Sequence, residues 1–316
     1  MQHNRKILYL LLLFLGVVLT FLLWEISAET LRFHLPRRGV KLAALCLTGT
    51  AIALSTTVFQ TVSGNTILTP SILGLDSLYL LIQTMTVFFL GSTGLVMMNR
   101  LTDYLISLGV MILFSLLLFS LLLGKKTIGV SLVLLLGMMF GQLFGGISSF
   151  FQLLIDPNEF LTVQSRMFAS FNMINSSLLG ISAIVFGISL CFLLPHMATL
   201  DVLSLGKDVS LTLGVSYNRA SRLFLVFVAI CTALSTALVG PVTFLGLIAV
   251  SLGRQISQTY RHSMLFPVTS LLSMTALVGG QFLVERVFHL NTPISVLIHG
   301  IGGIYFLVIL MKRSNI

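Results

Sequence analysis

One short stretch of this chain concentrates positive charge: residues 32–41 carry Arg32, Arg37, Arg38 and Lys41. Grouped cations can bind an acidic protein, because complementary charge speeds the encounter and fixes the register of the two surfaces. They can also hold a helix end among lipid headgroups, which is the simpler interpretation. The residue types alone leave both interpretations open.

A second candidate binding stretch is LDVLSLGKDVSLTLGVSYNRASR, residues 200–222. Its leucines and Val209 recur at helical intervals, and Lys207 and Asp208 lie between them. This pattern predicts a short amphipathic helix pair. Such a pair can lie on a membrane surface as an anchor, or it can insert into the groove of a cytoplasmic protein.

The sequence predicts no catalytic, metal or cofactor site. The six histidines show no metal-ligand spacing, and no H-E-x-x-H motif occurs. The segment LLGKKT, residues 122–127, resembles a phosphate-binding loop only superficially. Phe119 stands where the first glycine is required, and an apolar helix precedes the segment instead of a strand. Any ATPase that drives this protein is therefore expected to be a separate subunit.

Asp76 and His299 are ionisable residues that fall inside expected apolar segments. An acid inside a bilayer is by default a functional hypothesis. Asp76 follows Pro70 by six residues, so a structural position near a helix end is the simpler interpretation, and a transport role stays open. His299 is expected to be a hydrogen-bonded packing residue. An intramembrane enzyme would require a catalytic partner for Asp76, and the sequence offers no visible one.

Composition indicates the elements that position these residues. The chain has 316 residues, of which 56% are hydrophobic and 9% charged, and its mean hydropathy is +1.06. Soluble domains carry about 25% charged residues, so we expect an all-α, polytopic membrane protein with one domain over residues 1–316. The net charge of +9 is spread in small groups between apolar segments, which favours orientation in lipid over binding of nucleic acid.

Ten segments are apolar enough to be candidate spans, each of which needs roughly 20 residues. They are residues 7–26, 39–62, 70–91, 101–123, 130–154, 174–195, 221–239, 241–254, 264–287 and 294–311. The eighth is short, and Gly240 and Pro241 precede it, so a break or half-helix is expected there.

The distribution of cations favours one orientation. With the N-terminus inside, eleven of the 18 lysines and arginines lie on the inner side and seven on the outer side. An inner excess predicts cytoplasmic N- and C-termini. Four of the seven outer cations lie in residues 32–41, so this stretch departs from the usual rule.

Glycines recur every four residues in the segment 130–154, at Gly137, Gly141 and Gly145. On a helix they share one face, where small residues let two backbones approach closely. We expect tight packing there, which is compatible with a gate helix and indicates no chemistry.

Several motifs recur in order over nearly the whole chain. They are LPRR at 35–38, Q-x4-N-x4-P-x2-LG at 60–74, LSLGKDVSLTLGV at 203–215, GPVTFLGL at 240–247 and the tail from residue 291. Together they resemble the FecCD family, the permeases of bacterial importers for iron-siderophore complexes and vitamin B12. Within it the chain looks closest to permeases for catecholate-type siderophores such as petrobactin. Thr66 stands where the family has proline, and Lys207 replaces the first acid of its cytoplasmic loop.

The resemblance implies an ATP-driven importer for ferric siderophores that works by alternating access in the bacterial cytoplasmic (inner) membrane. The implied partners are a second permease chain, usually a different one, a cytoplasmic ATPase dimer and an extracytoplasmic siderophore-binding protein. Arg37, Arg38 and Arg286 match outward positions that dock the binding protein, and Arg32 joins them by proximity.

The remaining assignments follow the same resemblance and the glycine pattern. ATPase coupling is expected at Leu205, Gly206, Lys207, Asp208 and Gly214. A translocation path or gate is expected at Gln60, Asn65, Pro70, Gly137, Gly141, Gly145, Gly240 and Pro241. The alternative is a self-contained secondary transporter with inverted repeats. Residues 1–155 and 156–316 show no obvious internal similarity, which weakens that alternative.

Overall fold

The computed structural model describes residues 2–24, 31–97, 99–123, 130–171, 174, 176–287 and 293–314. Within these described residues, seven helical segments are long and apolar enough to cross a membrane. They contain α1 (Gln2–Leu23), α2 (Leu31–Ser63), α4 (Arg100–Leu123), α5 (Val130–Leu154), α7 (Ser176–Leu193), α10 (Tyr217–Val239) and α12 (His262–Phe282). The described residues thus form an all-helical, multi-pass membrane fold, as expected.

Shorter apolar helical stretches of the described residues lie at the other expected segments: Leu75–Gly91 within α3 (Leu75–Met97), α11 (Phe244–Ser257) and Ile294–Val308 within α13 (Ile294–Ser314). The largest boundary difference concerns α2. The expected span starts at residue 39, whereas the helix begins at Leu31 and continues through Pro36. The cation-rich stretch therefore forms the first turns of a helix.

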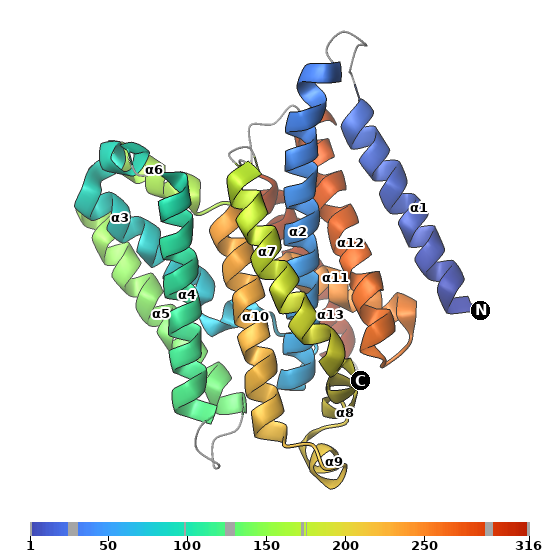
Figure 1. Ribbon diagram of the computed structural model, residues 1–316. Helices are drawn as coiled ribbons and strands as arrows, with labels where there is room; N and C mark the ends of the chain where they lie inside the picture. The colour runs from blue at the N-terminus through green and yellow to red at the C-terminus, as the bar shows by residue number, and fades with distance from the viewer. Residues whose placement is uncertain are drawn as a thin grey trace.

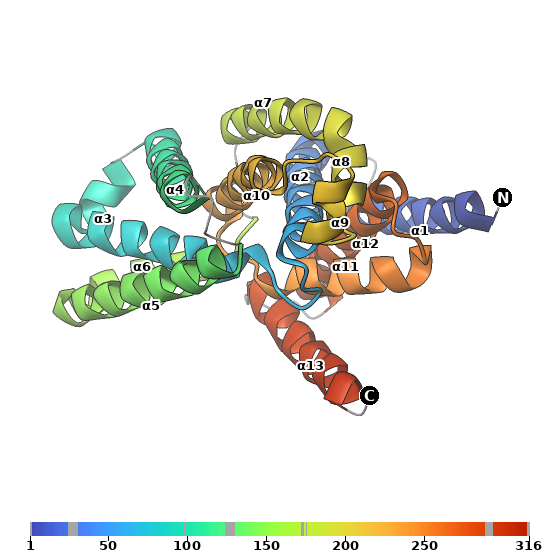
Figure 2. The same ribbon diagram turned by 90° about the horizontal axis from the view of Figure 1, so that it is seen from below.

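The helices form a central bundle with a lobe on one side (Figures 1 and 2). α2, α10, α11 and α12 lie in the bundle, with α1 against α12, and α3, α4, α5 and α6 (Pro157–Arg166) form the lobe. The short helices α8 (Met197–Leu203) and α9 (Lys207–Thr212) lie at the end of the bundle opposite the first turns of α2 (Figure 1). Sites at these two ends are therefore separated by the length of the bundle.

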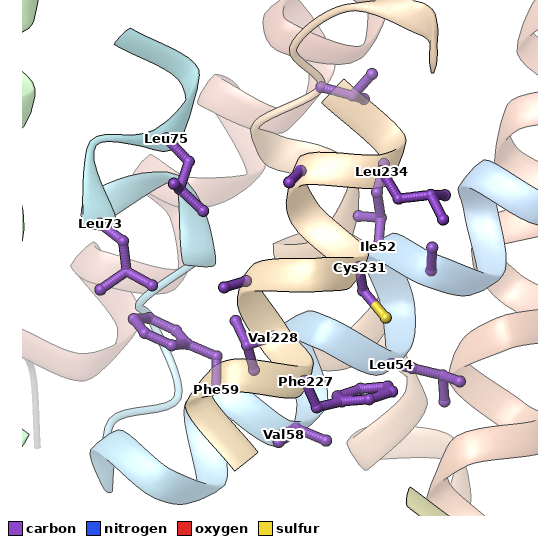
Figure 3. Close-up of a cluster of buried hydrophobic side chains, with 14 of the residues drawn as sticks. Ile52, Leu54, Val58, Phe59, Leu73, Leu75, Phe227, Val228, Cys231 and Leu234 are labelled. Atoms are coloured by element: carbon purple, nitrogen blue, oxygen red, sulfur yellow. The ribbon is translucent and has the colours of Figure 1, made fainter. Parts of the chain in front are cut away.

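An apolar contact between α2 and α10 forms the centre of the bundle (Figure 3). Val58 and Phe59 of α2 lie in one cluster with Phe227 and Val228 of α10, and each of these side chains is at most 1% exposed. Lipid is itself apolar, so helices in a bilayer are held mainly by close van der Waals packing. This contact fixes α10 against α2.

The lobe meets the bundle through α4, which packs against α10, and through a close backbone contact at Gly74, which follows η1 (Pro70–Leu73). Gly74 has φ +78°, a conformation that favours glycine. A Cβ there would lie 2.8 Å from the Cα of Gly141 and 2.9 Å from the carbonyl oxygen of Gly137. Close approach is thus observed at two of the three spaced glycines. Among the described residues, no atom lies within 4 Å of a Cβ built at Gly145.

The chain breaks between α10 and α11, as Gly240 and Pro241 predict. Gly240 has φ +102°, and a Cβ there would lie 3.1 Å from the Cα of Ala169. The N–H of Ser170 donates a hydrogen bond to the carbonyl oxygen of Val239 at 2.8 Å. The segment after α6 therefore packs directly against the break.

Helix α6 was not among the expected elements. The Asp156 carboxylate caps it by accepting a hydrogen bond from the N–H of Asn158 at 2.8 Å, and Pro157 occupies its first position. Both are ordinary signals for a helix start. The sequence therefore carries the signals for the start of this helix, which is too short to cross a membrane.

Candidate functional site

Four cations line a cavity at the end of the bundle where α2 begins. Arg37, Arg38 and Lys41 of α2 and Arg286 of η3 (Leu283–Val287) surround a cavity of about 590 Å³, together with Glu285. We call Arg37, Arg38, Lys41 and Arg286 the outer cationic cluster. One carboxylate among these lining residues offsets only part of their charge, so the cavity favours an anionic or acidic partner. Arg32 lies in the first turn of α2, and its side chain is outside the described residues.

Arg38 is bound to the carbonyl groups at the end of α1. Arg37 is exposed, whereas Arg38 is 9% exposed. The Nη1 atom of Arg38 donates to the carbonyl oxygens of Phe21, Leu22 and Trp24 at 3.3, 2.8 and 2.9 Å. Carbonyls at the end of a helix lack partners in the helix and attract cations. Arg38 therefore fastens the end of α1 to α2.

Replacing Arg38 with alanine should detach the end of α1 and lower the free energy of unfolding by about 1.5–3 kcal/mol, the range for hydrogen bonds to a charged group. Thermal unfolding in detergent, together with limited proteolysis between α1 and α2, measures the effect. Arg219→Ala, the same change at an exposed arginine of α10, is the matched control and should unfold as the wild type does. Equal unfolding of all three proteins would show that Arg38 does not hold α1.

Glu285 links α2 to the end of α12. Its Oε1 atom forms an ion pair with the Nζ atom of Lys41 and accepts a hydrogen bond from the Nε2 atom of Gln281 at 2.5 Å. The Lys41 and Glu285 side chains are 17% and 24% exposed. This pair sets the position of η3, and with it the adjacent Arg286, relative to the first turns of α2.

The opposite end of the bundle carries the predicted short helix pair, α8 and α9. Gly206 and Gly214, with φ +95° and +81°, flank α9, a backbone conformation that glycine adopts at little cost. Leu205, Leu211 and Leu213 are 52–58% exposed. Lys207 and Asp208 are exposed in the first turn of α9. The pair thus presents several large apolar side chains and two charges at one end of the molecule, which is typical of a binding surface.

The residues expected along a path or gate occupy different environments. Gln60 is 2% exposed, and neither its Nε2 nor its Oε1 atom has a partner among the described residues. Asn65 is exposed, and its Oδ1 atom accepts a hydrogen bond from the N–H of Ile67 at 3.0 Å. Pro70 is buried at the start of η1. The structure brings Pro70 into the turn that Gly137 and Gly141 contact, and it places Gly240 and Pro241 at the α10–α11 break.

Asp76 and His299 both lie close to that break. The Oδ1 atom of Asp76 accepts a hydrogen bond from the Oγ1 atom of Thr236 at 3.2 Å, and Asp76 borders a cavity of about 20 Å³. A cavity of this size holds roughly one water molecule. The Nε2 atom of His299 accepts a hydrogen bond from the N–H of Thr243 at 3.4 Å, so His299 is hydrogen-bonded as expected.

Asp103 of α4 is a buried acid, 8% exposed, that was not among the expected site residues. Its Oδ2 atom lies 2.9 Å from the Nη1 atom of Arg166, and its Oδ1 atom accepts a hydrogen bond from the Nε2 atom of Gln83 at 3.0 Å. Both carboxylate oxygens are therefore satisfied, which is how proteins tolerate a buried charge. This contact joins α3, α4 and α6 into one lobe.

Comparison with known proteins identifies the family. The FecCD transport family matches residues 7–312 of the sequence. The chain belongs to this family. Its membership agrees with the resemblance seen in the motifs and with the multi-pass helical fold.

Curated FecCD-type relatives match over most of the chain. The petrobactin import system permease protein YclO of Bacillus subtilis (strain 168) is 46% identical over 315 residues, which cover 100% of this chain and 99% of that protein. The petrobactin import system permease protein FatC of Bacillus anthracis is 38% identical, covering 88% of this chain and 78% of that protein. The petrobactin import system permease protein FatD of Bacillus anthracis is 26% identical, covering 88% of this chain and 81% of that protein.

A solved structure shares the fold of this FecCD chain. It is a metal-chelate type ABC transporter in an inward-facing conformation, with a TM-score of 0.82 and 23% identity, covering 98% of this chain and 99% of that one. At this identity the likeness shows the fold alone.

Proposed function

We propose that this chain is the membrane permease of an ATP-driven importer for ferric siderophores, with ferric petrobactin as the first candidate substrate. The observation that carries the proposal is the 46% identity to a petrobactin import permease over the full length of both chains. The whole chain would act as one permease domain in the cytoplasmic (inner) membrane. This identity favours the importer over a self-contained secondary transporter.

Ten spans with cytoplasmic N- and C-termini remain our topology. The chain ends point toward the end of the bundle that carries α8 and α9, whereas the first turns of α2 lie at the other end (Figure 1). In this orientation the outer cationic cluster lies on the extracytoplasmic side, where the binding protein would dock. Arg37 and Arg286 would contact its acidic side chains directly, and Arg38 would support Arg37 from the α1 side.

A second, different permease chain is the proposed membrane partner. Two different Bacillus anthracis permeases named for petrobactin import, FatC and FatD, both match this sequence. Gly145 and Gly146 of α5 and Gly300 and Gly303 of α13 have no described atom within 4 Å of a built Cβ. Exposed small residues let a helix of another chain approach closely. α5 and α13 lie along the same side of the molecule in Figure 2, so this side is the proposed permease interface.

The pair α8–α9 is proposed to fit a groove of a cytoplasmic ATPase dimer, through Leu205, Gly206, Lys207, Asp208 and Gly214. ATP binding can change the gate only if the ATPase contacts one conformation better than the other. Leu205 and its neighbours offer the exposed apolar contacts that such a difference requires. We place the gate at two points. One is the contact of Gly137 and Gly141 with the turn that begins at Pro70, and the other is the break at Gly240 and Pro241 between α10 and α11. Gln60, Asn65 and Gly145 would lie along the path.

Uptake by the reconstituted importer tests this function. Proteoliposomes would hold this chain, its partner permease and the ATPase, with the binding protein and iron-labelled ferric petrobactin outside. We expect uptake that requires ATP on the ATPase side and stops when this chain is omitted. Uptake driven by a proton gradient without the ATPase would contradict the proposal and support a secondary transporter. ATP-dependent uptake of a different ferric siderophore would change the substrate and keep the mechanism.

A further inference from the structure

Three helix ends meet at the end of the bundle that carries α8 and α9. His262 at the start of α12 lies between Asp201 of α8 and Thr61 near the end of α2, and it is within hydrogen-bond distance of both. The Oδ1 atom of Asp201 accepts hydrogen bonds from the backbone N–H of His262 at 2.8 Å and from its Nδ1 atom at 2.6 Å. The Nε2 atom of His262 lies 2.8 Å from the Oγ1 atom of Thr61. We call these three residues the helix-end link.

The link is buried and satisfies groups that would otherwise lack partners. His262 is 2% exposed and Thr61 is 8% exposed, and the Asp201 side chain is 28% exposed. The first N–H groups of a helix have no partner within the helix, and a carboxylate there is favoured by the helix dipole. Asp201 therefore caps α12 from a different helix, so any displacement of α8 acts on the start of α12.

The helix-end link can form with His262 either neutral or protonated. The Thr61 hydroxyl has one proton, and both His262 and the carbonyl oxygen of Thr57, at 3.0 Å, lie within its reach. With a neutral imidazole, Nδ1–H donates to Asp201 and Thr61 donates to Nε2. With an imidazolium, Nε2–H donates to Thr61, and Thr61 donates to Thr57. All three residues stay joined in both cases.

The order of these residues, an acid, a histidine and a hydroxyl, also occurs in hydrolase triads. In a hydrolase, the hydroxyl oxygen must be open to substrate. Here Thr61 is almost fully buried inside α2 and is also bonded toward the carbonyl of Thr57. The geometry therefore serves to connect helices and does not expose a nucleophile.

The connection continues on both sides of the link. On one side, the Oγ atom of Ser210 in α9 donates to the carbonyl oxygen of Val202 in α8 at 3.1 Å, so α9 is tied to the turn that carries Asp201. On the other side, the hydroxyl of Tyr217 donates to the carbonyl oxygen of Val62 at 3.3 Å, which ties α10 to the same turn of α2. The exposed pair α8–α9 is thereby joined to α2, α10 and α12.

We propose that Asp201, His262 and Thr61 are positioning residues that transmit the movement of α8–α9 to the end of α2 and the start of α12. This inference rests on the proposed coupling of α8–α9 to an ATPase. The last turn of α2 leads to Asn65, Pro70 and the Gly74 turn, so a shift of α2 reaches the proposed gate through few residues.

The test uses the complete importer in proteoliposomes and measures siderophore transported per ATP hydrolysed. Thr61→Val removes the hydroxyl and nearly keeps the shape of the side chain. Asp201→Ala removes the carboxylate that accepts both hydrogen bonds from His262. Each should lower this ratio about tenfold, the effect of one lost hydrogen bond to a charged group. Thr61→Ser and Asp201→Asn keep the hydroxyl and the acceptor oxygen, so they should restore most of the ratio.

Matched controls separate transmission from folding and from the proposed function. Thr48→Val makes the same change in a buried residue of α2 whose hydroxyl has no described partner, and it should leave the ratio unchanged. Thr61→Val combined with Asp201→Ala should behave like either alone, since both break one link. Additive losses, or a normal ratio in both single variants, would overturn the inference. A normal ratio after Gly206→Pro, which disrupts α9 directly, would instead overturn the coupling role of α8–α9.

Discussion

Replacing Gly74 with alanine should strongly destabilise this protein. Two costs combine at this position. A non-glycine residue at positive φ costs about 1–2 kcal/mol. A Cβ placed 2.8 Å from the backbone of Gly141 adds an overpacking cost of about 1–3 kcal/mol, because the obstacle is backbone that no side-chain rotation can move. We expect early thermal unfolding in detergent and looser packing of the turn against α5.

Gly145→Ala is the matched control for this prediction. Gly145 lies on α5, one turn beyond Gly141, and its built Cβ meets no described atom within 4 Å. This chain alone should therefore unfold at an unchanged temperature. If Gly74→Ala and Gly145→Ala unfold alike, the close contact between the turn and α5 does not contribute to the stability of this protein.

Reversing the charges of Arg37 and Arg286 together should weaken docking of the binding protein roughly 100-fold at low salt, because each change replaces an attraction with a like-charge contact. The loss should shrink as salt rises, since the screening length falls to about 3 Å at 1 M. Binding of the purified binding protein to the importer in nanodiscs measures both effects. Arg38 is left unchanged in this variant because it holds α1.

Lys207→Glu is the control, a charge reversal on the exposed surface of α9 at the other end of the bundle. It should leave binding of the carrier protein unchanged and alter only coupling. An unchanged affinity in the Arg37 and Arg286 variant would remove the outer cationic cluster from docking.

The sequence predicts the elements of this fold well because lipid imposes strong local rules. Long apolar runs, the Gly240–Pro241 break and the short amphipathic pair at 200–222 are all local patterns, and each corresponds to structure. The start of α2 differs from the prediction because a proline and several cations are typical of residues outside an apolar span, whereas here the helix runs through them. Helix α6 is too short to be recognised by its length as a span, although Asp156 and Pro157 signal its start.

The sequence could not reveal which polar side chains meet across helices. Arg38 looked like a second docking residue, and only the packed structure shows its bonds to the end of α1. Asp103 and His262 lie 63 and 61 residues from their partners Arg166 and Asp201, so no local spacing connects them. Interhelical contacts of this kind depend on tertiary packing, which a single sequence does not encode in any short motif.

Labelling from each side of the membrane tests the central claim most directly, since docking and coupling both require the two ends of the bundle to face opposite compartments. Arg37→Cys and Val209→Cys place a thiol at an exposed position at each end. The chain used has serine in place of the half-buried Cys46 and the exposed Cys191, and its remaining Cys231 is buried. A membrane-impermeant maleimide should label residue 37 in intact cells and residue 209 only after the membrane is opened. Labelling of residue 209, but not of residue 37, in intact cells would contradict the proposed orientation and, with it, both proposed binding surfaces.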